Sequence, residues 1–375
     1  LKVYNACCKF PESERTTATL LSQLDFDFFE VLDSVTIARS RKHIQNYYDV
    51  TDIGTFPARN KPISLRPKLT DRPGAINYKE VFELLSKLQL TIYTPTIYIH
   101  ASKLHKYLDE KESENFRKGR ELGIQRLMSI NLLKRMESSV HSFLLTVRRI
   151  YDYLYDTSQA IEQFMMDGTG DLDEMSERSA VADDFDYDEQ NTEFCSVGKK
   201  VKIDLRDMDY ISWKRDIDED IENLQLLILM VEDITPEYDF KLNELIRVIR
   251  EKVDAPINEG NRKVLIFTAF SDTAEYLFDN ISGMARDELG LHTALVTGSV
   301  DGKTTIPKFK ADMNHVLSCF SPMSKDRDVL YPNDKTEIDI LIATDCISEG
   351  QNLQECDFCI NYDIHWNPVR IIQRF

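Results

Sequence analysis

The chain has 375 residues, 42% of them hydrophobic and 29% charged, which is enough for two or three globular domains with substantial cores. The sequence contains no apolar run of roughly 18 residues and no signal-peptide pattern at its N-terminus, so composition excludes a membrane span. The net charge of −18 argues against a surface coated uniformly with basic residues for nucleic acid.

The charge is uneven along the chain. Eleven acidic residues and one basic residue lie between Asp167 and Glu193, and this stretch contributes −10 of the net charge. The remainder can therefore form a local basic groove. Few large apolar residues occur in the stretch, so we expect a flexible or solvated linker; partner binding or DNA mimicry is the less favoured alternative.

Seven irregularly spaced cysteines indicate a reducing compartment, and we expect a cytoplasmic protein. Cys356 and Cys359 form a CxxC pair, but residues three apart in a strand point to opposite faces, which favours structural roles. His100 and His105 do not have the spacing of a zinc protease, and the histidines are interpreted as structural. The sequence predicts no metal site.

Residues 1–70 form the first predicted segment. Residues 26–48 show helical spacing and end in a basic cluster that complements the helix dipole. Phe56-Pro57 and Lys61-Pro62 mark an extended strip. Neither a GxxxxGK[ST] loop nor an Asp-Glu-Ala-His box occurs anywhere in the 375 residues.

Residues 71–166 are predicted to be mostly helical, with a strand-like piece at 91–100. From 114 to 166 the apolar residues follow three-four spacing, which indicates one long helix or a hairpin of two. Four cations lie on this pattern, and a solvated helix face is favoured over contact with phosphates. These cations are Lys134, Arg135, Arg148 and Arg149.

The acidic stretch is assigned to residues 167–200 and a helical lead-in to 201–258. Within the lead-in, residues 207–231 form one predicted helix. Thr235 is the predicted N-cap of a second helix, with Pro236 at its first position and Val253 at its end.

Strands and helices alternate in residues 259–375, which predicts an α/β fold with a parallel sheet. The expected strands are 263–267, 292–296, 338–343 and 358–362. Ser271 or Asp272 is expected to cap a helix that ends at Met284. A further helix is expected at 309–320, a charged loop at 325–337, and the start of a helix at Val369.

Polar residues follow the last two of these strands. They are Asp345, Glu349, Gly350, Asp363 and Asn367. In parallel α/β sheets, ligands bind at the carboxyl ends of the strands, so these side chains are expected to line a ligand crevice.

The segment from Ile338 to Phe375 resembles motif V and the opening of motif VI of superfamily two helicases and translocases. Its Thr344-Asp345, Glu349-Gly350, Asn352-Leu353-Gln354, Trp366-Asn367-Pro368 and Gln373-Arg374 occur in the order seen in the Swi/Snf-like branch, including bacterial members. Looser similarities extend the resemblance upstream, at residues 39–42 and 56–61, at 131–143, at Asp239 and Lys241, and at a motif IV-like 263–271.

The resemblance implies an ATP-driven motor on double-stranded nucleic acid, with DNA favoured. Residues 1–70 would be the end of a first lobe and the connector between lobes, and residues 71–166 a helical insertion. Residues 259–375 would be a RecA-like second lobe, truncated in motif VI and preceded by a mostly helical region. Five residues would then line the nucleotide cleft: Asp345, Glu349, Gly350, Gln373 and Arg374. Five would contact the nucleic-acid backbone: Thr268, Thr297, Gly298, Ser299 and Thr344.

The same resemblance implies ATP and Mg²⁺ as cofactors of an intact protein. The family's phosphate-binding loop and arginine fingers are missing from these 375 residues, so this chain alone is expected to be inactive and to bind neither cofactor tightly. Protein partners are expected at the helical region and the acidic stretch, and no membrane. The alternatives are an inert binding module and, less favoured because no GxGxxG follows a strand, a small-molecule enzyme.

Overall fold

The computed structural model describes residues 10–11, 60–107, 114–168, 203–298, 302–347 and 351–364. Contacts divide the chain into two compact units, Leu1–Leu65 and Arg66–Phe375. The predicted helix at 26–48, most of the acidic stretch and the start of the last helix lie outside the described residues. The boundaries of the five predicted segments stay predictions. Every described helix and strand belongs to the second unit.

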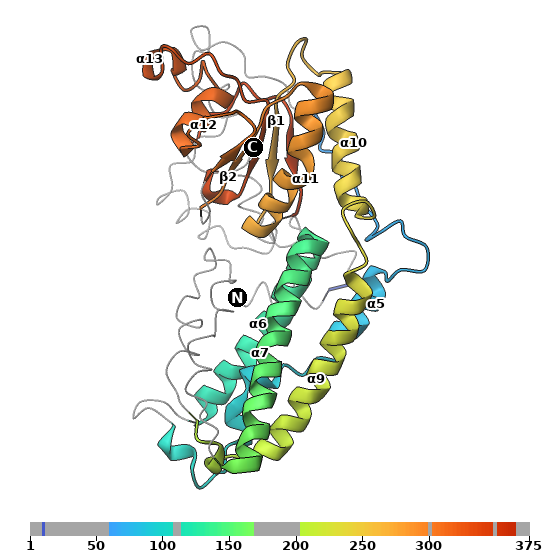
Figure 1. Cartoon of the computed structure of the whole chain (residues 1–375), viewed down its shortest axis with the longest axis vertical. Helices are drawn as coiled ribbons and strands as arrows, with labels where there is room; N and C mark the ends of the chain where they lie inside the picture. The colour runs from blue at the N-terminus through green and yellow to red at the C-terminus, as the bar shows by residue number, and fades with distance from the viewer. Residues whose placement is uncertain are drawn as a thin grey trace. The chain divides into compact units, whose positions relative to one another are not determined.

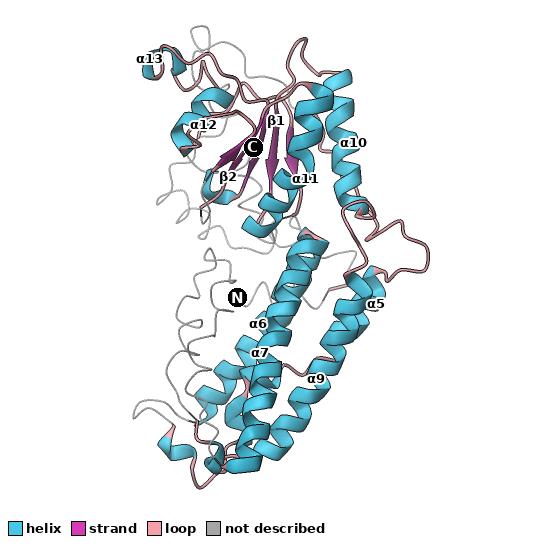
Figure 2. Cartoon of the chain, viewed as in Figure 1, coloured by secondary structure: helices cyan, strands magenta, loops and turns pink. Residues whose placement is uncertain are grey.

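The first half of this unit is helical (Figures 1 and 2). Its α-helices are α5 (Tyr78–Leu85), α6 (Glu114–Ser138), α7 (Val140–Asp167) and α9 (Tyr210–Val231). Short 3-10 helices lie at Thr91–Tyr93, Pro95–Tyr98, Leu104–Lys106 and Leu205–Asp207. One apolar cluster joins α5, α6, α7 and α9, with Phe143, Ile150, Leu154 and Ile217 at most 1% exposed.

Ser139 separates α6 from α7. Its backbone is extended (φ −154°, ψ 151°), and its hydroxyl accepts a hydrogen bond from the Ser142 amide at 3.0 Å, which makes it the N-cap of α7. The long apolar pattern is therefore two packed helices rather than one, the second of the two predicted alternatives.

The predicted strand at 91–100 is wrong. These residues form two 3-10 turns, and only Ile99 makes a bridge, to Met208. Side chains of α9 bind the main chain just before the first turn and at its first residue. The Asp220 carboxylate accepts from the amides of Gln89 and Leu90 at 2.7 and 2.6 Å, and Trp213 donates to the Thr91 carbonyl at 3.3 Å. Branched residues supplied a strand-like pattern, but tertiary contacts satisfy the backbone here.

The predicted start of the next helix is also wrong. Helix α10 runs from Phe240 to Asp254, and its N-cap is Asp239, whose carboxylate accepts from the Leu242 amide at 3.0 Å. Thr235 is instead the first residue of a turn, since its carbonyl accepts hydrogen bonds from the amides of Tyr238 and Asp239. The Thr-Pro pair is a helix-start signal, but the carboxylate four residues later provides the cap.

A five-stranded sheet forms the second half of the described unit, in the order β3-β2-β4-β1-β5. Its strands are β1 (Val264–Phe267), β2 (Thr293–Val296), β3 (Lys303–Thr304), β4 (Ile340–Ala343) and β5 (Cys359–Asn361). Four strands are parallel, as predicted, and the short β3 pairs antiparallel with β2. This is the RecA-like α/β lobe that the sequence predicts.

Alternate residues of the strands point into two separate cores. Val264, Ile266 and Ile340 pack with α10 and α11 (Ser271–Leu289) on one face. Leu265, Phe267 and Leu341 pack with α12 (Met313–Phe320) on the other face. Figure 1 shows these helices on opposite sides of the sheet. Burial on both faces explains why the strands are continuous apolar runs.

Three helix boundaries in the lobe differ from the prediction. No side chain caps α11, which begins after Phe270 and ends at Leu289, with Gly290 (φ 65°) as its C-cap, not at Met284. Helix α12 begins later than predicted because Asp312 caps it, accepting from the amides of Asn314 and His315. The predicted charged loop contains a single helical turn, α13 (Arg327–Leu330).

Among the described helices, none is long and apolar enough to cross a membrane.

Candidate functional site

The carboxyl ends of the parallel strands bring the predicted site residues to one edge of the sheet. Val296, Ala343 and Phe267 are level with one another in the strand register. The next residue along each strand is a threonine, so Thr297, Thr344 and Thr268 form a row across three adjacent strands. Main-chain hydrogen bonds fix this row, from the Thr268 amide to the Ala343 carbonyl (3.0 Å) and from the Thr344 amide to the Val296 carbonyl (3.3 Å).

At the ends of β2 and β4 this edge is open to solvent, and we call this the outer part of the edge. Gly298 is exposed, and Thr297 and Asp345 are half-buried. Thr344 is buried, and its hydroxyl donates to the Cys346 sulfur at 3.5 Å. A Cβ atom on Gly298 would lie 3.6 Å from the Cβ of Cys346, so the two strand-end turns pack against each other. This part presents backbone and short polar side chains to any ligand.

At the ends of β1 and β5 the edge is covered by protein, and we call this the inner part of the edge. Thr268 is fully buried, and its hydroxyl donates to Asp363 at 2.6 Å. Asp363 lies just after β5, is 4% exposed, and also accepts from the Ala269 amide at 2.8 Å. Direct contact between the Thr268 hydroxyl and a nucleic-acid phosphate would require these bonds to open, and that assignment stays a prediction.

The junction of α6 and α7 covers this inner part. The Ser138 hydroxyl donates to Asp363 at 2.6 Å and lies 2.8 Å from the Thr273 hydroxyl, which also contacts the Ser139 hydroxyl at 2.9 Å. We call Ser138, Ser139, Thr268, Thr273 and Asp363 the hydroxyl–carboxylate junction. All five residues are at most 4% exposed, and their polar atoms satisfy one another.

Two cations support the junction. Lys241, on α10, donates to the carbonyls of Glu137 and Ser138, the latter at 2.9 Å, and lies 4.2 Å from the Tyr362 ring centroid. These carbonyls end α6, where a positive charge is favourable. Burial lowers the pKa of Lys241, and Asp363 opposes that shift.

Arg135, on α6, is the second cation. It forms an ion pair with Asp272 on α11 at 2.7 Å, donates to the Ser142 hydroxyl at 3.0 Å, and lies over the Phe270 ring. The favoured prediction that Arg135 lies on a solvated helix face is wrong, because its side chain is 5% exposed. Arg148 is half-exposed and pairs with Glu232 at 3.1 Å.

Sequence reasoning missed the polar residues of the helices. Ser138 and Ser139 lie within a stretch that was singled out for its cations. Two adjacent hydroxyl side chains at a break between two apolar patterns were the signal that could have identified them. Six predicted site residues lie outside the described residues: Ser299, Glu349, Gly350, Asn367, Gln373 and Arg374.

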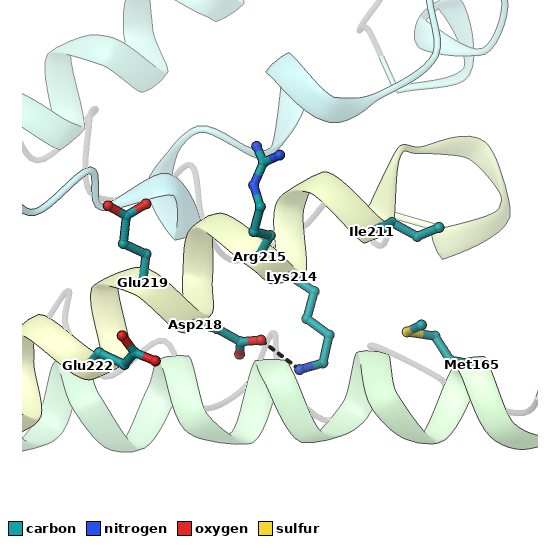
Figure 3. A pocket seen from close by; sticks show the side chains of 7 residues that line it. All are labelled: Met165, Ile211, Lys214, Arg215, Asp218, Glu219 and Glu222. Carbon is teal, nitrogen blue, oxygen red and sulfur yellow. Dashed lines mark hydrogen bonds and ion pairs between the residues drawn. The ribbon is translucent and has the colours of Figure 1, made fainter.

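A separate surface pocket of about 420 Å³ lies between the end of α7 and the start of α9 (Figure 3). Lys214 crosses it to Asp218 at 2.8 Å and to Ser158 at 2.9 Å. The lining residues are Met165, Ile211, Lys214, Arg215, Asp218, Glu219 and Glu222. Three carboxylates against two cations make it unsuited to a triphosphate.

Comparisons with known proteins bear on the sheet and its edge. Residues 241–375 match the helicase conserved C-terminal domain family. The chain is 55% identical over 38 residues to an uncharacterised ATP-dependent helicase, YqhH, of Bacillus subtilis, and this match covers 10% of this chain and 7% of YqhH. The chain is 29% identical over 143 residues to a putative ATP-dependent DNA helicase, fml2, of Schizosaccharomyces pombe, and this match covers 36% of this chain and 15% of fml2. The matches thus span a small part of either relative.

A solved structure, the Hef helicase domain of Pyrococcus furiosus, is similar at 17% identity with a TM-score of 0.30, over 79% of this chain and 49% of that one.

Proposed function

We propose that this chain is the C-terminal portion of an ATP-dependent DNA helicase or translocase of superfamily two, in the Swi/Snf-like branch. The match of residues 241–375 to the helicase conserved C-terminal domain family supports this proposal. One observation carries the proposal. The threonine row lies at the carboxyl edge of a parallel sheet, within the segment that matches the helicase domain. That edge is where α/β sheets bind ligands.

On the nucleotide side, Asp345 lines the cleft together with Glu349, Gly350, Gln373 and Arg374. Among the described residues of this edge, the donors are hydroxyls and amides, and the charged side chains are the carboxylates of Asp345 and Asp363. Bound ATP and Mg²⁺ would supply the phosphoryl group and the charge that balances it. Since the 375 residues contain no GxxxxGK[ST], the chain provides one wall of the cleft and binds neither ligand tightly on its own.

On the nucleic-acid side, Thr297, Gly298, Ser299 and Thr344 contact the backbone of duplex DNA, with Thr268 behind them. Hydroxyl and amide donors at phosphates position a duplex without reading its sequence. Gly298 is exposed and has no side chain, so a backbone can approach the turn closely. Binding is therefore independent of sequence and weakens as salt rises.

The helical region and the acidic stretch are the surfaces proposed for protein partners, in a cytoplasmic protein. The alternative function is an inert binding module, in which the lobe keeps its fold without contributing to hydrolysis. An upstream GxxxxGK[ST] and a downstream Gly-Arg in the intact protein would favour the motor over the module.

The test is the ATPase rate with and without duplex DNA, measured on residues 1–375 and on the intact protein that contains them. We expect DNA-stimulated hydrolysis by the intact protein and none by residues 1–375. If neither protein hydrolyses ATP, while cooperative unfolding shows that both are folded, the motor hypothesis is wrong and the binding-module hypothesis remains.

A further inference from the structure

A cluster of three metal-binding side chains lies away from the strand-end site. Within the described residues, His315 Nε2, Cys319 Sγ and an Asp334 carboxylate oxygen lie within 4.8 Å of one another. His315 and Cys319 are four apart on α12, so they share one face of the helix. Asp334 comes from the segment that leads into β4.

The histidine is held in place before any metal arrives. Its ring is stacked between Phe309 and Tyr331, with ring centroids at 4.3 and 4.2 Å. Its Nε2 faces Asp334 at 2.7 Å. A ligand fixed in this way loses little conformational entropy on binding.

The carboxylate is also held. One oxygen of Asp334 accepts from the Thr336 amide at 2.8 Å, and the other faces both His315 and, at 3.9 Å, the Cys319 sulfur. Bond lengths of about 2.0–2.3 Å place two ligands of one Zn²⁺ roughly 3–4 Å apart. The cluster therefore needs only small side-chain adjustments.

We propose that His315, Cys319 and Asp334 form a Zn²⁺ site with a water as fourth ligand, which pins the segment before β4 to α12. Nitrogen, thiolate and carboxylate together are the donor set of this ion. His315 and Asp334 are 18% and 22% exposed, so the site has an opening for the ion and for the water. Cys319 is buried and closes the inner side.

Binding has a defined proton balance. Zn²⁺ binds a cysteine as the thiolate, so coordination by Cys319 releases the thiol proton to solvent. His315 coordinates through Nε2, the ring nitrogen that faces Asp334. Arg327 lies near the thiol, but its guanidinium donates to the Thr336 carbonyl at 2.9 Å.

The experiment uses residues 1–375, stripped with a chelator and then titrated with Co²⁺ and Zn²⁺. We expect one ion per chain, a thiolate-to-cobalt charge-transfer band that Zn²⁺ abolishes, and a higher Tm with Zn²⁺. Cys319→Ser should abolish the band, and His315→Gln and Asp334→Asn should each weaken Co²⁺ binding at least tenfold.

The matched control is the double variant Cys356→Ser/Cys359→Ser, which removes the CxxC pair and should keep the band and the affinity. Loss of the band in that variant, or unchanged affinity in His315→Gln and Asp334→Asn, would overturn the site. The last two variants alter half-buried side chains, so they decide the question even where Cys319→Ser does not fold.

Discussion

The Ser138 hydroxyl donates a 2.6 Å hydrogen bond to the Asp363 carboxylate, which lies 225 residues later in the chain. Ser138 ends α6, and Asp363 follows β5 at the carboxyl edge of the sheet. Thr268 and the Ala269 amide donate to the same carboxylate. A single buried side chain thus joins the helical region to two strand ends next to the proposed ligand edge.

Replacement of Asp363 by alanine should destabilise the unit strongly. Three donors, the Ser138 and Thr268 hydroxyls and the Ala269 amide, would lose their acceptor in a buried site. We expect a loss of about 3 kcal/mol or more in the free energy of unfolding, because each unsatisfied buried group costs roughly 1–3 kcal/mol. Chemical denaturation measures this loss.

Asp363→Asn keeps one oxygen as an acceptor and should cost less than the alanine variant. The exposed Glu259→Gln, which removes the same charge elsewhere in the lobe, serves as the control and should change stability by less than about 0.5 kcal/mol. Equal stability of Asp363→Ala and the control would mean that the carboxylate does not hold this junction.

The pair of Arg135 and Asp272 gives a second prediction. The side chains meet at 2.7 Å with Arg135 buried, so each depends on the other. A double-mutant cycle with Arg135→Gln and Asp272→Asn should give a coupling energy of about 1–3 kcal/mol in unfolding. Strictly additive single-variant effects would show that α6 and α11 are not coupled through this pair.

Asp220 predicts a specific pH dependence of stability. Burial raises its pKa from 3.8 to about 6, although the amides of Gln89 and Leu90 oppose the shift. The folded state thus holds a proton that the unfolded state releases first. The contribution of Asp220 is present in full below about pH 4 and is lost as the pH rises to about 6.

Asp220→Asn removes this titration. The difference in unfolding free energy, wild type minus variant, should therefore fall between about pH 4 and pH 6 and stay constant above that window. Lost hydrogen bonds in the variant add an offset that does not depend on pH. Parallel stability profiles of the two proteins across the window would contradict the assigned shift.

The sequence predicted β1, β2 and β4 well because these strands are buried on both faces. Each is a continuous apolar run followed by a threonine, which leaves few alternatives to a parallel strand. The ends of the helices were less predictable, as Thr235 shows. The N-cap is Asp239, and its carboxylate also accepts from Tyr276 at 3.0 Å, a contact that no local pattern contains.

The positions of the candidate site residues were predictable only where they follow the strands directly. Thr268, Thr297 and Thr344 come next to one another because strand register aligns them. Ser138 joins them from a helix far away in the chain, and a single sequence does not reveal which helix covers which strand end. The His315–Cys319 pair was overlooked for the same reason, since Asp334 approaches only through the fold.

A substitution at Gly298 tests ligand binding separately from stability. Among the described residues, a Cβ there would meet Cys346, at 3.6 Å, which is an ordinary contact, and the glycine does not have a positive φ. Gly298→Leu should therefore leave the free energy of unfolding within about 0.5 kcal/mol of the wild type. The added side chain lies where a duplex backbone would approach, so the affinity for DNA should fall about tenfold or more.

Fluorescence anisotropy with a labelled duplex at low salt measures this affinity for residues 1–375. The control is Gly283→Leu, the same substitution at an exposed position of α11 with open space around it. Since α11 leads from the end of β1 back toward the start of β2, Gly283 lies away from the carboxyl edge. Equal DNA affinity in the two variants would remove Gly298 from the nucleic-acid surface, whereas a loss confined to Gly298→Leu would place the duplex at the outer part of the edge.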